Sequence, residues 1–260
     1  MATTICMLNF KGGVGKTTVT VNLGAALARL KKKVLIIDLD GQCTATKTFA
    51  AKTPYDGETI YDFLSGKTQS AFAYETLQNN LDYVPSSQEM KFIEMELARK
   101  REREHILEKF VSQVSSAYDY ILLDCPPGQG IITDNAMVAA QKIIIPVKCE
   151  VYSMFGLHDI IAESDDIKAG SNPSLEILGI IANAYDGRTY INRNISSALN
   201  ESYPGMVFST MIRKTVSLAE FSAAEQSIFD YDEKSSAALD FLNLGKEVIK
   251  KTSNQSNKKS

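Results

Sequence analysis

Residues 9–18 of this chain read Asn-Phe-Lys-Gly-Gly-Val-Gly-Lys-Thr-Thr, and they carry the strongest structural signal in the sequence. An apolar run at 5–8 precedes it and predicts a short buried strand, while the Ala- and Leu-rich run at 19–30 predicts a helix. A strand, a glycine-rich turn and a helix in this order are typical of a phosphate-binding loop. Glycines let the turn bend so that backbone N–H groups point at a phosphate, and the helix N-terminus adds partial positive charge.

The side chains of this loop predict which part of a nucleotide each would contact. Lys16 would reach the β- and γ-phosphates, and the Thr17 hydroxyl would ligate Mg²⁺. The spacing departs from the general pattern, because Phe10 stands where a glycine is expected and a second lysine, Lys11, opens the loop. Two cations beside one glycine turn repel each other unless an anion lies between them, so Lys11 also indicates a phosphate. The alternative interpretation is a glycine-rich β-turn with two solvated lysines.

The loop closely resembles the deviant Walker A motif of the ParA/MinD family of P-loop ATPases. The resemblance implies that Lys11 is the signature lysine, which crosses a dimer interface to the phosphates of the partner's nucleotide. A cation delivered in this way would act as an arginine finger does. It further implies ATP and Mg²⁺ as ligands. The expected ATP contacts in the loop are Lys11, Gly12, Gly13, Val14, Gly15, Lys16, Thr17 and Thr18.

Two apolar strands predicted at 34–37 and 118–123 end in carboxylates, and parallel strands would bring these carboxylates to the P-loop. The first strand ends in Asp38 and Asp40, and Asp124 follows the second in the Walker B arrangement. By resemblance, Asp40 orients or activates the attacking water, and Asp38 supports it. The alternative is an Asp pair that only caps a strand end. The predicted catalytic residues are Lys11, Lys16 and Asp40, and the predicted magnesium contacts are Thr17, Asp40 and Asp124.

Two further segments resemble the switch regions of the same family. Residues 38–46 resemble switch I, expected here as a loop, although Gly41 replaces the usual proline and Cys43 the usual glycine. Residues 124–136 resemble switch II and the helix that follows it. The proline pair at 126–127 would stiffen this segment so that it can sense the γ-phosphate.

The carboxyl-terminal half supplies the remaining expected contacts. By resemblance, the amide of Asn183 reads the adenine edge. Arg188 and Arg213 match basic positions that the family uses for DNA, and Lys214 adds a charge, while Ser217 stands where many members carry an arginine. Each of the three cations could instead be an ordinary surface charge. A net charge of −3 and a pI of about 5.6 do not themselves indicate nucleic-acid binding.

The order of predicted elements indicates the fold class. Strands alternate with helices, without an internal repeat or a linker, which predicts an α/β fold with a single doubly wound, mostly parallel sheet. We expect one P-loop ATPase domain over 1–251 and a polar, disordered tail over 252–260. We also expect helices at 59–65, 152–169 and 235–251, and strands at 81–84, 142–147, 175–184 and 207–211. The charged stretch 88–114 predicts one or two surface helices, and its run 99–104 is expected to be a solvated helix face.

Composition limits the cellular setting. The N-terminus shows no signal-peptide pattern, and no apolar run approaches 18 residues, so we expect a cytoplasmic protein without a membrane segment. The four cysteines are scattered, which predicts buried, reduced thiols and no zinc site. These cysteines are Cys6, Cys43, Cys125 and Cys149.

The resemblance is closest to the ParA/Soj-like members, and it implies a partition ATPase for plasmid or chromosome segregation. Such a protein forms an ATP-dependent sandwich homodimer, binds double-stranded DNA without sequence preference on the nucleoid, and is stimulated by a ParB-like partner. No helix-turn-helix precedes the P-loop, so operator-specific binding is not expected.

Three alternatives come from other classes. A MinD-like membrane-positioning ATPase would end in a basic amphipathic helix, and the helix at 235–251 could serve as that anchor, although core packing is the better interpretation. An iron–sulfur ATPase would present cysteines at a dimer axis, which Cys125 does not fit. A bacterial tyrosine kinase would carry a Tyr-rich tail, and no tyrosine follows Tyr231.

Overall fold

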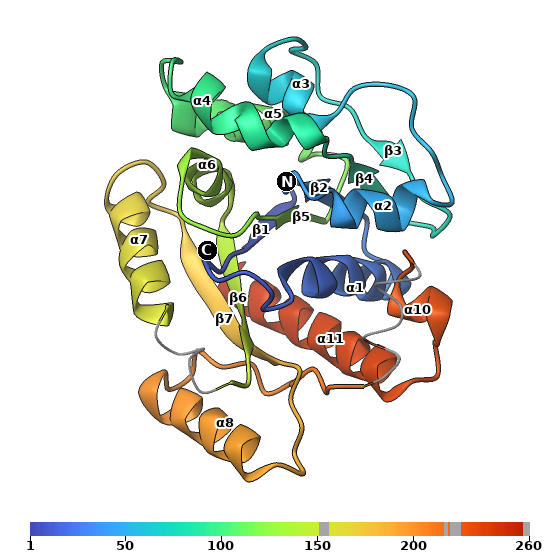
Figure 1. The fold of residues 1–260 in the computed structure, drawn as a ribbon, viewed down its shortest axis with the longest axis vertical. Helices are drawn as coiled ribbons and strands as arrows, with labels where there is room; N and C mark the ends of the chain where they lie inside the picture. Colours follow the sequence, from blue (N-terminus) through green and yellow to red (C-terminus); the bar gives the residue numbers. More distant parts are fainter. Residues whose placement is uncertain (151–155, 216–217, 219–224, 257–260) are drawn as a thin grey trace.

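The computed structural model describes residues 1–150, 156–215, 218 and 225–256. It contains one seven-stranded sheet in the order β3-β4-β2-β5-β1-β6-β7 (Figure 1). Every neighbouring pair is parallel except β3 and β4, so the predicted doubly wound, mostly parallel sheet is confirmed. The strands are β1 (Thr3–Met7), β2 (Val34–Asp38), β3 (Tyr74–Glu75), β4 (Leu81–Val84), β5 (Tyr120–Asp124), β6 (Lys142–Lys148) and β7 (Glu176–Asn183).

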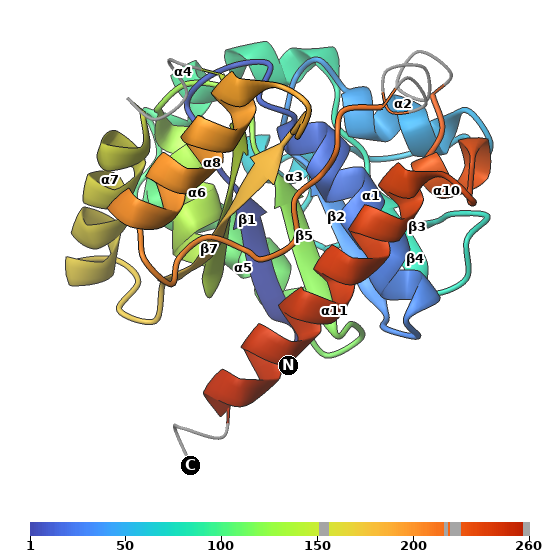
Figure 2. The same ribbon diagram turned by 90° about the horizontal axis from the view of Figure 1, so that it is seen from below.

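The central strands are apolar along their whole length because helices cover both faces of the sheet. All residues of β2 and β5 are buried, which is the pattern of a parallel sheet with no solvated face. One face packs against α1 (Lys16–Arg29), α2 (Thr44–Ala50), α10 (Ile228–Tyr231) and α11 (Ser236–Ser256). Figures 1 and 2 show α11 running along α1 on this side.

The other face packs against a longer series of helices. They are α3 (Ile60–Ser65), α4 (Ile93–Leu97), α5 (Ile106–Val114), α6 (Ile131–Ala139), α7 (Leu157–Ala169) and α8 (Tyr190–Ser202). Two 3₁₀ segments, η1 (Gln88–Phe92) and η2 (Arg103–His105), lead into α4 and α5. Strand β1 lies between β5 and β6, so the loop that follows it opens at the carboxyl edge near the middle of the sheet (Figure 1).

Several predicted elements differ from the structure. The charged stretch at 88–114 forms four short pieces, and its run 99–104 is mostly a turn rather than a helix face. The expected strand at 207–211 makes only one bridge, between Val207 and Ile180, and a second bridge, between Arg213 and Tyr185, follows it in the chain. Switch I is not all loop, because α2 begins at Thr44. Helix α7 begins at Leu157, and residues 152–155 of the predicted helix lie outside the described residues. The sequence did not predict α8, β3 or α10.

The last helix is longer than the sequence predicted. Helix α11 continues to Ser256, so residues 252–256 are helical rather than part of a disordered tail, while 257–260 lie outside the described residues. Thr252 explains the difference: its side chain is buried, and its hydroxyl hydrogen-bonds that of Tyr120 at 2.8 Å. This contact joins α11 to β5, which lies 132 residues earlier in the chain, and sequence periodicity could not show it. None of the helices in the described part of the chain is long and apolar enough to span a bilayer.

Candidate nucleotide site

The glycine-rich loop adopts a backbone that side chains would disfavour. Gly13 and Gly15 have φ values of 72° and 93°, in the left-handed region that glycine adopts readily. A Cβ on Gly15 would lie 2.1 Å from Nδ2 of Asn183, so this position also has no space for a side chain. Gly12 and Gly13 are exposed on the rim, and Val14 is buried. Helix α1 begins at Lys16, three residues earlier than the sequence predicted.

Lys16 is buried and is held by the loop itself. Its ammonium donates to the carbonyl oxygens of Asn9 at 2.8 Å and of Lys11 at 3.2 Å. Burial lowers the pKa of Lys16, while the nearby carboxylates of Asp124 and Asp40 act in the opposite direction. The loop therefore holds the Lys16 ammonium in place, close to the carboxylates of Asp124 and Asp40.

Asn9 orders this loop, although the sequence analysis assigned it no role. Its side-chain amide donates to the carbonyl of Pro146 on β6, and its Oδ1 accepts the backbone N–H of Lys11 at 2.9 Å. Asn9 thus fixes the loop to the neighbouring strand and sets the turn at Lys11. Its place directly before the lysine was the available signal, because Asn side chains commonly bond the backbone two residues on.

Asp38 and Asp124 are brought side by side, as the strand pattern predicted. They are register partners at the ends of β2 and β5, and both are buried. Asp38 is fully hydrogen-bonded: Oδ1 accepts the N–H of Asp40, and Oδ2 accepts the N–H and the hydroxyl of Thr46. Burial raises the pKa of Asp38, and the bonds from Thr46 oppose the rise. Asp38 therefore fixes switch I, and Thr46 is a second residue whose role the sequence did not show.

Asp124, unlike Asp38, has a carboxylate oxygen that is not satisfied by the described residues. Its Oδ1 accepts the hydroxyl of Thr20 at 3.1 Å, but its Oδ2 is buried and accepts no hydrogen bond from the described residues. Burial and the Asp38 carboxylate raise the pKa of Asp124, while the hydroxyls of Thr17 and Thr20 act against the rise. A buried carboxylate oxygen without a donor is suited to a hard cation, and Mg²⁺ prefers oxygen ligands. The side chains of Asp124 and Thr17 therefore fit a magnesium ion.

A cavity of about 390 Å³ lies over the P-loop. Its walls come from three predicted motifs, because Asp40 and Gln42 of switch I and Pro127 of switch II face the glycines, Lys16, Thr17 and Thr18. Asp40 is partly exposed, and its Oδ1 accepts the N–H of Gln42. The structure thus brings Lys16, Thr17, Asp40 and Asp124 to one place.

Asn183 lies at the end of β7 against the P-loop. Its Nδ2 donates to the carbonyl of Val14 at 2.8 Å, and its Oδ1 accepts the N–H of Ala184. The side chain is buried and directly contacts the loop. Its expected contact with adenine stays a prediction.

The three expected DNA contacts gather at the carboxyl end of β7, but two of them are ion-paired. Arg188 makes a two-bond pair with Asp186, both bonds at 2.9 Å, and its side chain is 90% exposed. Arg213 pairs with Asp240 of α11, whose side chain is only 9% exposed, and also donates to the carbonyl of Ser236. Lys214 is exposed and forms no salt bridge with a described residue. Exposed Tyr190 and Ile191 follow Arg188, and the sequence did not indicate them.

Comparisons with known proteins agree with this geometry. A protein-family model described as an AAA domain matches residues 2–177 of the chain. The chain is 34% identical to the chromosome-partitioning ATPase Soj of Treponema pallidum, over 96% of this chain and 98% of that protein. It is also 34% identical to the chromosome partitioning protein ParA of Myxococcus xanthus, over 95% of this chain and 88% of the relative. The chain belongs to the ParA/Soj family of P-loop ATPases.

A solved structure extends the comparison of this ParA/Soj-family protein. The cobyrinic acid a,c-diamide synthase of Mycobacterium smegmatis, with bound ADP and magnesium, superposes with a TM-score of 0.77 at 27% identity. The match covers 86% of this chain and 94% of the synthase. The ParA and Soj relatives confirm the family resemblance stated from the sequence.

Proposed function

We propose that this protein is a Mg²⁺-dependent partition ATPase that binds DNA as an ATP-bound dimer. The observation that carries the proposal is the single cavity where the P-loop, Asp40 and Pro127 meet beside the unsatisfied oxygen of Asp124. ATP would bind there with its phosphates on the loop N–H groups and Lys16. Related proteins act in chromosome partitioning or bind ADP with magnesium, which supports the same ligands here.

The residues of the chain have separable roles in this reaction. Lys16 offsets the phosphate charge, and Thr17 and Asp124 would hold Mg²⁺, which stabilises negative charge on the transferred phosphate when it is bound. Asp40 is placed on the cavity wall, where its carboxylate can orient a water toward the γ-phosphate. Since ground-state binding depends on the loop, Asp40 contributes to turnover rather than to affinity.

Dimerisation is supported by the position of Lys11. It is exposed on the rim of the loop, and its ammonium forms no salt bridge with any described residue. Lys16, by contrast, is buried and hydrogen-bonded within its own loop. A free cation beside a phosphate site is suited to reach a nucleotide bound by a second copy. A ParB-like partner would then stimulate hydrolysis on the nucleoid.

The DNA surface is proposed with Lys214 and Arg188 as its main contacts. Arg213 has a mainly structural role, because its guanidinium joins the 206–214 segment to α11 through Asp240. Arg188 is different, because its pair with Asp186 is exposed and a phosphate can exchange for that carboxylate. Two protomers in a dimer would place two such patches on one duplex.

The membrane-positioning alternative has less support. The apolar face of α11 is buried against α1 through residues that include Phe241, Leu244 and Val248, so this helix is a core element rather than a lipid anchor. Exposing it to lipid would remove these side chains from the core at a large cost.

A mobility-shift titration tests the DNA proposal. Two unrelated duplexes are titrated with ATP or ADP at low and moderate salt, using wild type, Arg188→Glu with Lys214→Glu, and the control Lys168→Glu on α7. We expect binding with ATP alone, with equal affinity for both duplexes and an affinity that falls by about 0.9 log units per phosphate contact per log unit of salt. The double variant should lose binding to both duplexes. Equal binding with ADP, or wild-type binding by the double variant, would contradict the proposal.

A further inference from the structure

We propose that Glu94 of α4 is a positioning residue that holds switch II in place for ATP hydrolysis. Switch II is defined here as residues 125–130, between Asp124 and helix α6. The inference rests on the ATPase function proposed above. It assigns a role to a residue outside the nucleotide motifs, in the charged stretch that sequence patterns describe as a solvated surface.

Glu94 of α4 caps the N-terminus of α6, which lies 37 residues further along the chain. Its Oε2 accepts the N–H of Ile131 at 2.9 Å, and its Oε1 accepts the N–H of Ile132 at 3.1 Å. These are two of the N–H groups that the first turn of a helix leaves without partners. A carboxylate there also interacts favourably with the positive end of α6. Both oxygens of one side chain thus fix the residues directly after switch II.

Gly130 lets the carboxylate of Glu94 lie close to the backbone of switch II. A Cβ on Gly130 would lie 2.7 Å from Oε1 of Glu94 and 3.1 Å from its Cδ. Gly130 is also bonded reciprocally to Thr133, whose hydroxyl accepts the Gly130 N–H and donates to its carbonyl. The carboxylate of Glu94 therefore packs directly on the backbone of the last switch II residue.

The opposite part of switch II is attached to the P-loop. The N–H of Gly128 donates to the carbonyl of Phe10 at 2.8 Å, one residue before Lys11. Directly before Gly128, Pro127 forms a wall of the nucleotide cavity and would contact a Cβ on Gly12 at 3.8 Å. Switch II is thus held between the P-loop and Glu94, and its proline faces the expected position of the phosphates.

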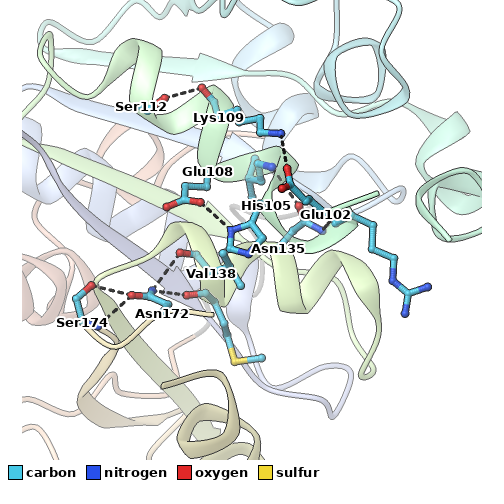
Figure 3. Close-up of polar contacts among 12 residues, drawn as sticks. Glu102, His105, Glu108, Lys109, Ser112, Asn135, Val138, Asn172 and Ser174 are labelled. Carbon is cyan, nitrogen blue, oxygen red and sulfur yellow. Dashed lines mark hydrogen bonds and ion pairs between the residues drawn. The ribbon is translucent and has the colours of Figure 1, made fainter. Parts of the chain in front are cut away.

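The rest of α6 is fixed without Glu94. Asn135 donates to the carbonyls of Arg103 and Ile131 and accepts the N–H of Leu107. Asn172 donates to the carbonyls of Met137, Val138 and Ala140 at the end of the helix (Figure 3). Loss of Glu94 should therefore loosen the start of α6 and switch II, while the helix itself stays in place.

Steady-state kinetics with matched variants test the inference. We compare wild type, Glu94→Gln, Glu94→Ala and the control Glu96→Gln, because Glu96 lies on the same helix but bonds Tyr61. We expect kcat to fall roughly tenfold in Glu94→Ala and less in Glu94→Gln, which keeps one acceptor oxygen. KM and the Kd for ATP should stay within about twofold of wild type, since the P-loop is unchanged. Glu96→Gln should keep the wild-type kcat.

Amide hydrogen exchange supplies a readout that does not depend on activity. Exchange over 125–134 should be faster in Glu94→Ala and unchanged in Glu96→Gln. The strands of the sheet should stay protected as in wild type in both variants. A wild-type kcat in Glu94→Ala, or a parallel loss of ATP affinity and global protection, would overturn the positioning role. A wild-type protein that hydrolyses no ATP would instead overturn the proposed function, and the positioning role of Glu94 in hydrolysis with it.

Discussion

Asp38 and Asp124 are register partners at the ends of β2 and β5, and they differ in how their oxygens are satisfied. Both oxygens of Asp38 accept hydrogen bonds from switch I, whereas Oδ2 of Asp124 accepts none from the described residues. Two buried carboxylates in neighbouring positions repel each other unless a proton or a cation lies between them. The two residues therefore differ in role: Asp38 holds switch I in place, whereas Asp124 has an oxygen that is suited to a metal ion.

Asp124→Asn should stabilise the protein without ligands and remove its response to Mg²⁺. The substitution keeps the shape but removes a buried charge whose pKa is raised, so the Tm without nucleotide at pH 8 should rise. The further rise in Tm on adding Mg²⁺ to the nucleotide-bound protein should disappear. Thermal melts with ADP, with and without Mg²⁺, measure this. Asp82→Asn, on β4 and bonded to Tyr118, is the control and should keep the Mg²⁺ response.

Asp40→Ala should keep ATP binding and lose turnover by roughly a hundredfold, as expected for a group that acts on the attacking water. Its carboxylate bonds only the nearby Gln42 backbone among the described residues, so the fold should be unaffected. Single-turnover hydrolysis gives the rate, and size-exclusion chromatography with ATP should show a persistent dimer. A monomer with normal hydrolysis would be incompatible with this role.

Arg213→Ala should lower the free energy of unfolding by about 1–2 kcal/mol, because it leaves the nearly buried Asp240 carboxylate without its partner. Arg188→Ala should have no measurable effect, since its ion pair is exposed. Urea unfolding of the two variants measures the difference. Equal stability of both variants would show that Arg213 has no structural role.

Asp134→Asn should stabilise the protein at pH 8 and have little effect at pH 4. Burial, and then the charges of Glu163 and Glu94, raise the pKa of Asp134 from 3.8 to about 6. The folded state therefore binds this proton more tightly than the unfolded state, and the associated stability is lost as pH rises from about 4 to about 6. By linkage the gain in Asp134→Asn is at most about 3 kcal/mol. Unfolding at the two pH values measures it, and an equal change at both would contradict the assignment.

The sequence predicted the parts of the site that are carried by local patterns. The glycine-rich loop, its lysines and the carboxylates at strand ends each depend on neighbours within a few residues, and parallel pairing then brings them together. The core strands were predicted for the same reason, because a strand covered on both faces is a continuous apolar run.

The sequence could not predict contacts that depend on tertiary packing. Glu94 lies in a stretch whose charges favour a solvated helix, yet its partners are 37 and 38 residues away. Arg213 looked like a free cation because Asp240 is 27 residues further along the chain. The expected strand at 207–211 is apolar enough to pair, but it only bridges β7, where Gly179 leaves space for Phe208.

The central claim is that this P-loop binds and hydrolyses Mg–ATP, and phosphate release by wild type and Lys16→Ala tests it most directly. Lys47→Ala is the matched control, because this exposed lysine of α2 bonds only the Gln42 carbonyl among the described residues. We expect steady phosphate release from wild type and Lys47→Ala with Mg²⁺, and none from Lys16→Ala or from wild type in EDTA. Phosphate release by Lys16→Ala at the wild-type rate would contradict the assignment of the site.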